Sequence, residues 1–88
     1  MRENPLKLAR ERLNISRHEL AVMSGVGPAT IYQAERGTLT RVPADVAAVL
    51  GALGVDVVVL GRDYAAWRAA LGDRVFAEVR SRQGFGAR

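Results

Sequence analysis

Side chains that could contact a nucleic acid recur at helical spacing between residues 28 and 36 of this 88-residue chain. At i, i+3, i+4 and i+7 of a helix they would share one face, and in order they are Ala29, Tyr32, Gln33 and Arg36. Glutamine and arginine reach base edges and phosphates, and Gln33 can pair with N6 and N7 of adenine. Ala29 and Tyr32 offer a methyl group and an aromatic edge to the thymine methyl. The face therefore suits the major groove of double-stranded DNA, and the plainer alternative is a helical hairpin whose polar face is solvated.

Two short helices joined by a tight turn, over residues 16–37, would position this face. Ser16 can cap the first helix, and Glu19 three residues later completes a capping box. Gly25 ends that helix where a left-handed residue is needed, and Pro28 suits the first turn of the second helix. Caps, turn and polar face agree, so the segment is predicted to be a DNA-binding helix-turn-helix.

The run from Leu13 to Gly37 resembles the helix-turn-helix of phage-repressor-type (XRE/Cro/CI-like) regulators. A Ser-Gln-x-x-Leu-Ala start, a Gly-Val-Ser turn, an Ile and a Glu-x-Gly end recur in that family. The corresponding segments here are Ser16–Ala21, Gly25–Gly27, Ile31 and Glu35–Gly37. The resemblance extends from Leu6 to about Val55. It implies a mainly α, repressor-like domain of four to five helices that binds DNA.

The chain departs from the family pattern at two places. Arg17 replaces the usual Gln at the start of the second helix, which still suits a phosphate contact. Pro28 and Ala29 stand where relatives often carry polar base readers, so that readout falls to Tyr32 and Gln33. The complete predicted DNA-binding set is Arg17, Ala29, Thr30, Tyr32, Gln33, Arg36, Thr38 and Arg41.

Some residues matched by the resemblance have alternative roles. Thr38 and Arg41 occupy a loop from which the family commonly contacts the DNA backbone, although Arg41 could also be a solvated loop charge. Arg10 and Glu35 match an Arg and a Glu that the family usually keeps. For this pair we expect a partly buried ion pair that joins the first helix to the third and does not contact DNA.

A first helix is predicted from Pro5 to about Leu13 and a fourth from Pro43 to Gly54. After the fourth helix the hydrophobic periodicity changes. Residues 55–60 are rich in β-branched side chains and lie between two glycines, which predicts a short strand. A further helix is expected over 64–71, ending at Gly72–Asp73. Residues 74–82 fit either a helix or a strand, and we favour a helix. The predicted organisation is a DNA-binding domain over 1–54, a dimerising strand-helix extension over 55–82 and a disordered basic tail over 83–88.

Composition narrows the function classes. The formal net charge of +4 favours an anionic partner, and the chain has no cysteine and one histidine. We find no Ser-His-Asp set, no phosphate-cradling glycine loop and no metal-ligand spacing, so neither an enzyme nor a cofactor nor a metal is expected. No run of about 18 apolar residues occurs, so we expect no membrane association and a cytoplasmic, nucleoid-associated protein.

The leading hypothesis is a sequence-specific transcriptional regulator, most simply a repressor that occupies an operator through helix 28–36. One alternative is an antitoxin that binds a toxin protein and represses its own operon, and another is a protein-interaction module without DNA binding. A chain of this length has a marginal core, so we expect a homodimer. In it the strand 55–60 would pair across a two-fold axis and place two recognition helices about 34 Å apart. The rival arrangement folds the C-terminal part back onto its own chain, giving a monomer.

Overall fold

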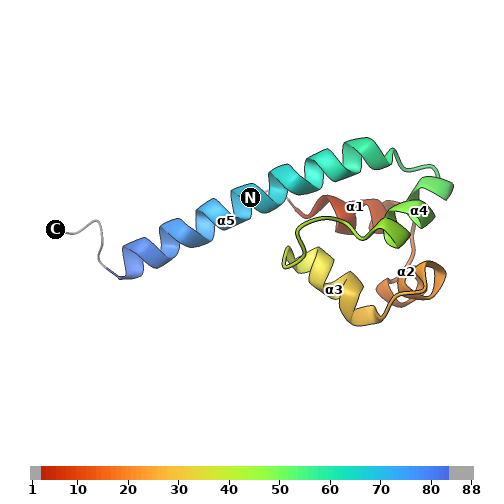
Figure 1. Cartoon of the computed structure of the whole chain (residues 1–88), viewed down its shortest axis with the longest axis horizontal. Coiled ribbons are helices and arrows are strands. Elements are labelled where there is room, and N and C mark those ends of the chain that lie inside the picture. The colour runs from red at the N-terminus through yellow and green to blue at the C-terminus, as the bar shows by residue number, and fades with distance from the viewer. Residues whose placement is uncertain (1–2, 84–88) are drawn as a thin grey trace.

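The computed structural model describes residues 3–83, which form five α-helices and no strand. Their bounds are α1 Pro5–Arg12, α2 Arg17–Ser24, α3 Pro28–Arg36, α4 Ala44–Ala52 and α5 Val57–Arg82. The first four helices form a compact group (Figure 1). Helix α5 packs on α1 and α4 along its first half and then projects away from the group, so that the longest extent of the molecule is 53 Å. The mainly α, repressor-like fold is therefore confirmed.

The predicted helix ends are confirmed where their chemistry is local. The Ser16 hydroxyl accepts a hydrogen bond from the Glu19 amide at 3.0 Å, and the Glu19 carboxylate accepts one from the Ser16 amide at 2.8 Å, which completes the capping box. Gly25 ends α2 at φ +70°, and Gly37 ends α3 at φ +85°, both in the left-handed region that glycine tolerates best. These caps fix the lengths of α2 and α3.

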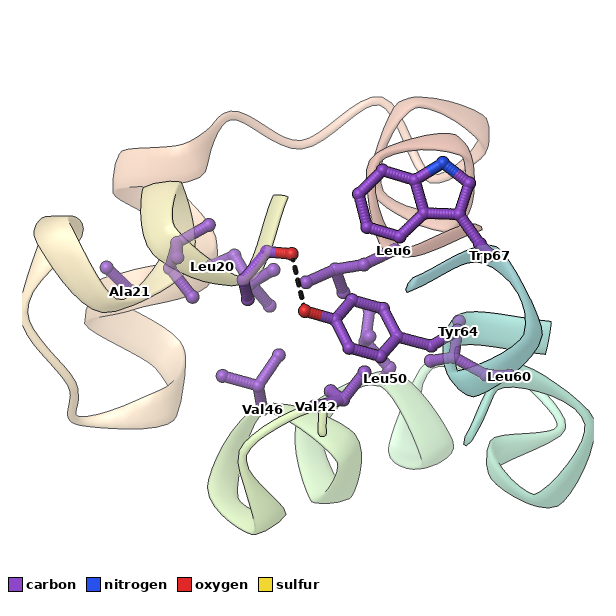
Figure 2. Packing of buried hydrophobic residues seen from close by; sticks show 11 residues of the cluster. Leu6, Leu20, Ala21, Val42, Val46, Leu50, Leu60, Tyr64 and Trp67 are labelled. Carbon is purple, nitrogen blue, oxygen red and sulfur yellow. Dashed lines mark hydrogen bonds between the residues drawn. The ribbon is translucent and has the colours of Figure 1, made fainter. Parts of the chain in front are cut away.

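One hydrophobic core joins all five helices. Its buried members are Leu6, Leu20, Ala21, Ile31, Ala34, Val42, Val46, Leu50, Leu60, Tyr64 and Trp67. Figure 2 shows Leu6, Val46, Leu50 and Tyr64 converging from α1, α4 and α5. Since α5 supplies the two largest of these side chains, its first half belongs to the same core as the predicted DNA-binding domain.

The predicted strand at 55–60 is wrong, because residues 57–60 form the first turn of α5. The Asp56 carboxylate accepts hydrogen bonds from the Val58 and Val59 amides, both at 3.1 Å, and so starts a helix. β-Branched residues cost a helix only some tenths of a kcal/mol each, roughly, relative to Ala. A lone strand would leave its backbone groups without partners, whereas a helix pairs its own. Burial then follows helical spacing, with Leu60 6% exposed and Val58 75% exposed.

The expected interruption at Gly72–Asp73 is also absent, and α5 continues unbroken to Arg82. A glycine inside a helix costs about 1 kcal/mol relative to Ala, which good helix formers on either side offset. The preference for a helix over residues 74–82 is thereby confirmed. Of the predicted tail, residues 84–88 lie outside the described part of the chain. None of the described helices combines the length and apolar character needed to cross a membrane.

Candidate nucleic-acid interface

Helices α2 and α3 are joined by a turn that sets the direction of α3. Gly25 reverses the backbone, and the Val26 amide donates to the Ala21 carbonyl at 3.1 Å. Gly27 is extended at the N-cap of α3, and Pro28 begins the helix. Helix α3 therefore buries Ile31 and Ala34 against the core and turns its opposite face to solvent. The predicted inner and outer faces of α3 are confirmed.

The structure leaves most of the predicted DNA-binding residues accessible. Thr30 is half-buried, and the exposed members are Arg17, Ala29, Tyr32, Gln33, Arg36, Thr38 and Arg41. Arg41 lies in the loop between α3 and α4. The Thr38 hydroxyl donates to the Gln33 carbonyl at 3.0 Å and so closes the end of α3. Thr38 thus has a structural role in addition to its predicted contact with DNA.

A carboxylate between two arginines ties the start of α2 to α1 and α3. Arg10 Nε donates to Glu35 Oε2 at 2.7 Å, and Arg17 Nε donates to Oε1 at 2.9 Å. The Glu35 side chain is only 3% exposed. Burial by itself would raise the pKa of Glu35, but hydrogen bonds from Arg10 and Arg17 outweigh it, and the pKa is lowered. The expected ion pair of Arg10 and Glu35 is confirmed, whereas the sequence pattern did not reveal that Arg17 joins it.

Tyr32 lies close to two guanidinium groups on the outer surface. The Cζ atom of Arg17 lies 5.8 Å from the Tyr32 ring centroid, and that of Arg36 lies 5.4 Å from it. Both distances suit a cation–π contact, which at an exposed site contributes about 0.5–1 kcal/mol. The hydrogen bond that Arg17 donates to Glu35 raises the pKa of the Arg17 guanidinium and also keeps that group near Tyr32. The structure therefore brings Arg17, Tyr32 and Arg36 together as one cationic and aromatic group.

The C-terminal end of α3 is held by a side chain that precedes α1 and by another from α5. Asn4 Nδ2 donates to the carbonyls of Ala34 at 3.0 Å and of Glu35 at 2.7 Å. The Tyr64 hydroxyl lies 2.8 Å from the Ala34 carbonyl and 3.0 Å from that of Leu39, between which it shares its one proton. The dashed line in Figure 2 marks the first of these contacts. The last four carbonyls of an α-helix have no i+4 amide partner within the helix, so side chains such as these complete their hydrogen bonding.

Helix α5 also covers the glycine that ends α3. Arg68 Nε donates to the Gly37 carbonyl at 3.0 Å, which places a cation at the negative end of the α3 dipole. A Cβ atom on Gly37 would lie 2.8 Å from the Trp67 ring and 2.9 Å from the Leu71 side chain. Gly37 is therefore required for close packing as well as for its positive φ. No local sequence signal identified Asn4, Tyr64 or Arg68 as supports of α3, because each acts across about 30 residues.

Within residues 3–83, no group of three or more His, Asp or Glu side chains is arranged to hold a metal ion. A family model described as helix-turn-helix matches residues 6–60, from α1 into the first turn of α5. Comparison with curated proteins and with solved structures finds no match. The matched range contains both helices of the motif and all eight predicted DNA-binding residues.

Proposed function

The chain belongs to the phage-repressor-type (Cro/CI-like) helix-turn-helix family of DNA-binding regulators, and we propose that it recognises a specific operator sequence through α3. This family is one of regulators and not of enzymes. The observation that supports operator recognition is that α3 has an exposed outer face on a helix whose end is held in place. Asn4, Tyr64 and Arg68 donate hydrogen bonds to the carbonyls at that end. A helix held in this way presents its side chains in one orientation.

Each exposed residue has a role in this proposal. Gln33 pairs with N6 and N7 of an adenine, and Tyr32 and Ala29 contact a thymine methyl. Arg17, Arg36 and Arg41 neutralise phosphates, and the hydroxyls of Thr30 and Thr38 bind phosphate oxygens. The guanidinium groups of Arg17 and Arg36 lie within about 6 Å of the Tyr32 ring centroid and would support the ring while its edge faces a base. Sequence would thus be read by α3, and the loop and the start of α2 would fix the register.

Repression follows most simply from occupancy, since a protein bound at an operator blocks the polymerase. Binding to operator DNA would place the protein on the nucleoid in the cytoplasm. A nine-residue helix reads only a few base pairs, which is too little to distinguish an operator from a genome. We therefore propose a homodimer that binds a near-palindrome with half-sites about 34 Å apart. Since residues 57–60 are helical, strand pairing cannot be what joins the two copies.

Selection from random DNA duplexes tests this function directly. The full chain is expected to enrich a single near-palindromic consensus. Titration of that consensus at several salt concentrations should then give an affinity that falls steeply with salt, because bound arginines release counterions. A pool without a consensus would contradict sequence-specific recognition. An affinity unchanged across a wide salt range would contradict DNA binding through phosphates.

A further inference from the structure

The second half of α5 leaves the body of the protein while still carrying apolar side chains. Leu71 packs beside Gly37, and beyond it residues 72–82, here named the distal segment, project from the helix group (Figure 1). Val75 is 49% exposed and Phe76 is 65% exposed, and Val79 lies one turn further along. These side chains share one side of the helix with Gly72, where a Cβ atom would meet nothing within 4 Å. The distal segment therefore carries a flat apolar face open to another surface.

A groove of about 690 Å³ lies between α1 and the first half of α5, and is here named the α1–α5 groove. Most of its lining residues are apolar, and the larger ones are Leu8, Leu13, Leu53, Val59, Leu60 and Trp67. Three carboxylates, from Glu3, Asp56 and Asp63, and one cation, Arg12, also line it. The groove is therefore apolar inside and predominantly acidic among its charged lining residues.

Length and charge match the groove to the distal segment. The groove wall runs from Asp56, the N-cap of α5, to Trp67, and the distal segment runs from residue 72 to Arg82. These spans are eleven and ten residue steps, or about 16 and 15 Å at 1.5 Å per residue. In an antiparallel arrangement the basic end of the segment, with Arg80 and Arg82, would lie beside Asp56 at the start of α5.

The segment cannot enter the groove of its own chain. Helix α5 is continuous from Val57 to Arg82, so its end points away from its beginning. A second copy of the chain carries both surfaces, and a two-fold axis near residues 67–71 of α5 would bring each segment to the other copy's groove. Such an interface is self-complementary, as two-fold dimers require.

We propose that the distal segment of each copy docks antiparallel in the α1–α5 groove of the other copy. This inference rests on the proposed homodimer and names the surfaces that form it. The apolar side chains of Val75, Phe76 and Val79 pack between α1 and α5 of the partner, and the arginines at the end of the segment lie beside the Asp56 carboxylate of the groove. Two identical contacts then hold the dimer.

Sedimentation of the full chain and of paired variants tests the proposal. Val59→Asp puts a charge in the groove, and Phe76→Asp puts one on the segment. Each is expected to raise the dimer dissociation constant at least about tenfold. Val58→Asp and Ala77→Asp are matched controls, because both positions are exposed and Val58 does not line the groove. The dimer dissociation constants of the two controls are expected to stay within about threefold of that of the unchanged chain. Far-ultraviolet circular dichroism checks that every variant keeps its helices.

Mixing the two disruptive variants separates a reciprocal exchange from other dimers. One intact groove and one intact segment remain in a mixed pair, so the mixture is expected to dimerise more tightly than either variant alone. If Phe76→Asp dissociates the dimer and Val59→Asp does not, the distal segments pair with each other and the inference is wrong. A dimer that neither variant weakens also overturns the inference. So does a distal segment that binds a toxin protein and no second copy of the chain.

The same measurements distinguish this inference from the proposed function. An unchanged chain that is monomeric at about millimolar concentration and binds DNA one-to-one overturns the homodimer and this interface, but leaves DNA recognition by α3 intact. A dimer that persists in all variants overturns the interface alone. If the unchanged chain is dimeric but does not bind any DNA sequence specifically, the proposed function is overturned and the interface is not.

Discussion

The Tyr64 hydroxyl of α5 lies 2.8 Å from the Ala34 carbonyl oxygen of α3, and this contact joins the long C-terminal helix to the second helix of the motif. Ala34 stands three residues before the glycine that ends α3, and its carbonyl also accepts hydrogen bonds from the Gly37 amide at 3.2 Å and from Asn4 Nδ2 at 3.0 Å. Tyr64 is 1% exposed, so the hydrogen bond is made inside the core. Helix α5 thus shares the core of the helix-turn-helix and does more than extend the chain beyond it.

Replacing Tyr64 by Phe is expected to lower the free energy of unfolding by about 1–2 kcal/mol. The ring would still fill its place, but the Leu39 carbonyl would lose its hydroxyl partner at a partly buried site. Urea denaturation measures the change. Tyr32→Phe is the matched control, because Tyr32 is 47% exposed and its loss should change the free energy by less than about 0.5 kcal/mol. Equal effects at both positions would contradict the role given to Tyr64.

Replacing Gly37 by Ala is expected to destabilise the protein more than replacing Gly25 by Ala. Both glycines have positive φ, so both substitutions carry a backbone cost of about 1–2 kcal/mol. At Gly37 the new Cβ would also lie 2.8 Å from the buried and rigid Trp67 ring, whereas at Gly25 it would meet nothing. We expect the difference to exceed about 1 kcal/mol in urea denaturation. Equal losses would mean that the Trp67 ring moves aside freely.

Acid is expected to weaken the protein partly through Glu35. Its pKa is lowered in the folded state from an ordinary value of 4.5, because hydrogen bonds from Arg10 and Arg17 outweigh the effect of burial. The folded state therefore binds the proton less well than the unfolded chain. The stabilisation is complete above pH 4.5 and is lost as the pH falls through the folded pKa.

Comparison of stability between pH 6 and about pH 3 tests this sign. Glu35→Gln should flatten the dependence on pH, since the amide does not titrate. Glu78→Gln is the control, because the Glu78 carboxylate is exposed and pairs only with Arg74 of the same helix among the described ion pairs. A Glu35→Gln variant with the pH dependence of the unchanged chain would contradict the linkage.

Gln33→Ala is expected to weaken binding to the selected operator by about 1–3 kcal/mol and to leave binding to random duplex almost unchanged. Gln33 is exposed in the middle of the outer face of α3, where its amide can pair with a base. Fluorescence anisotropy with both duplexes measures the two affinities. Equal losses on operator and random DNA would assign Gln33 to positioning instead of reading.

Arg41→Ala is expected to weaken specific and non-specific binding alike and to reduce the slope of log K against log salt by about 0.9. Arg41 is an exposed cation in the loop after α3, so its removal should not disturb the core. Arg17→Ala should have the same effect on the slope. It should also remove the cation–π contact between Arg17 and the Tyr32 ring. An unchanged slope would make Arg41 a solvated charge without a phosphate partner.

The sequence by itself determined the two helices of the motif and their faces, because the signals that define them act within a few residues. The cap of Ser16 and Glu19 spans three residues, and Gly25 and Gly37 each end a helix through their own φ. The spacing of Ile31 and Ala34 against Tyr32 and Gln33 likewise depends on one turn of helix. Each of these predictions is confirmed.

Only the tertiary structure decided the state of residues 55–60 and the support of α3. A run of β-branched residues favours a strand only slightly. Two effects outweigh that preference: Leu60 is buried, and a helix pairs its own backbone groups. The contacts of Tyr64 with Ala34 and of Arg68 with Gly37 join residues 30 and 31 positions apart. No local pattern encodes such contacts, because they exist only once α5 has packed across α1 and α4.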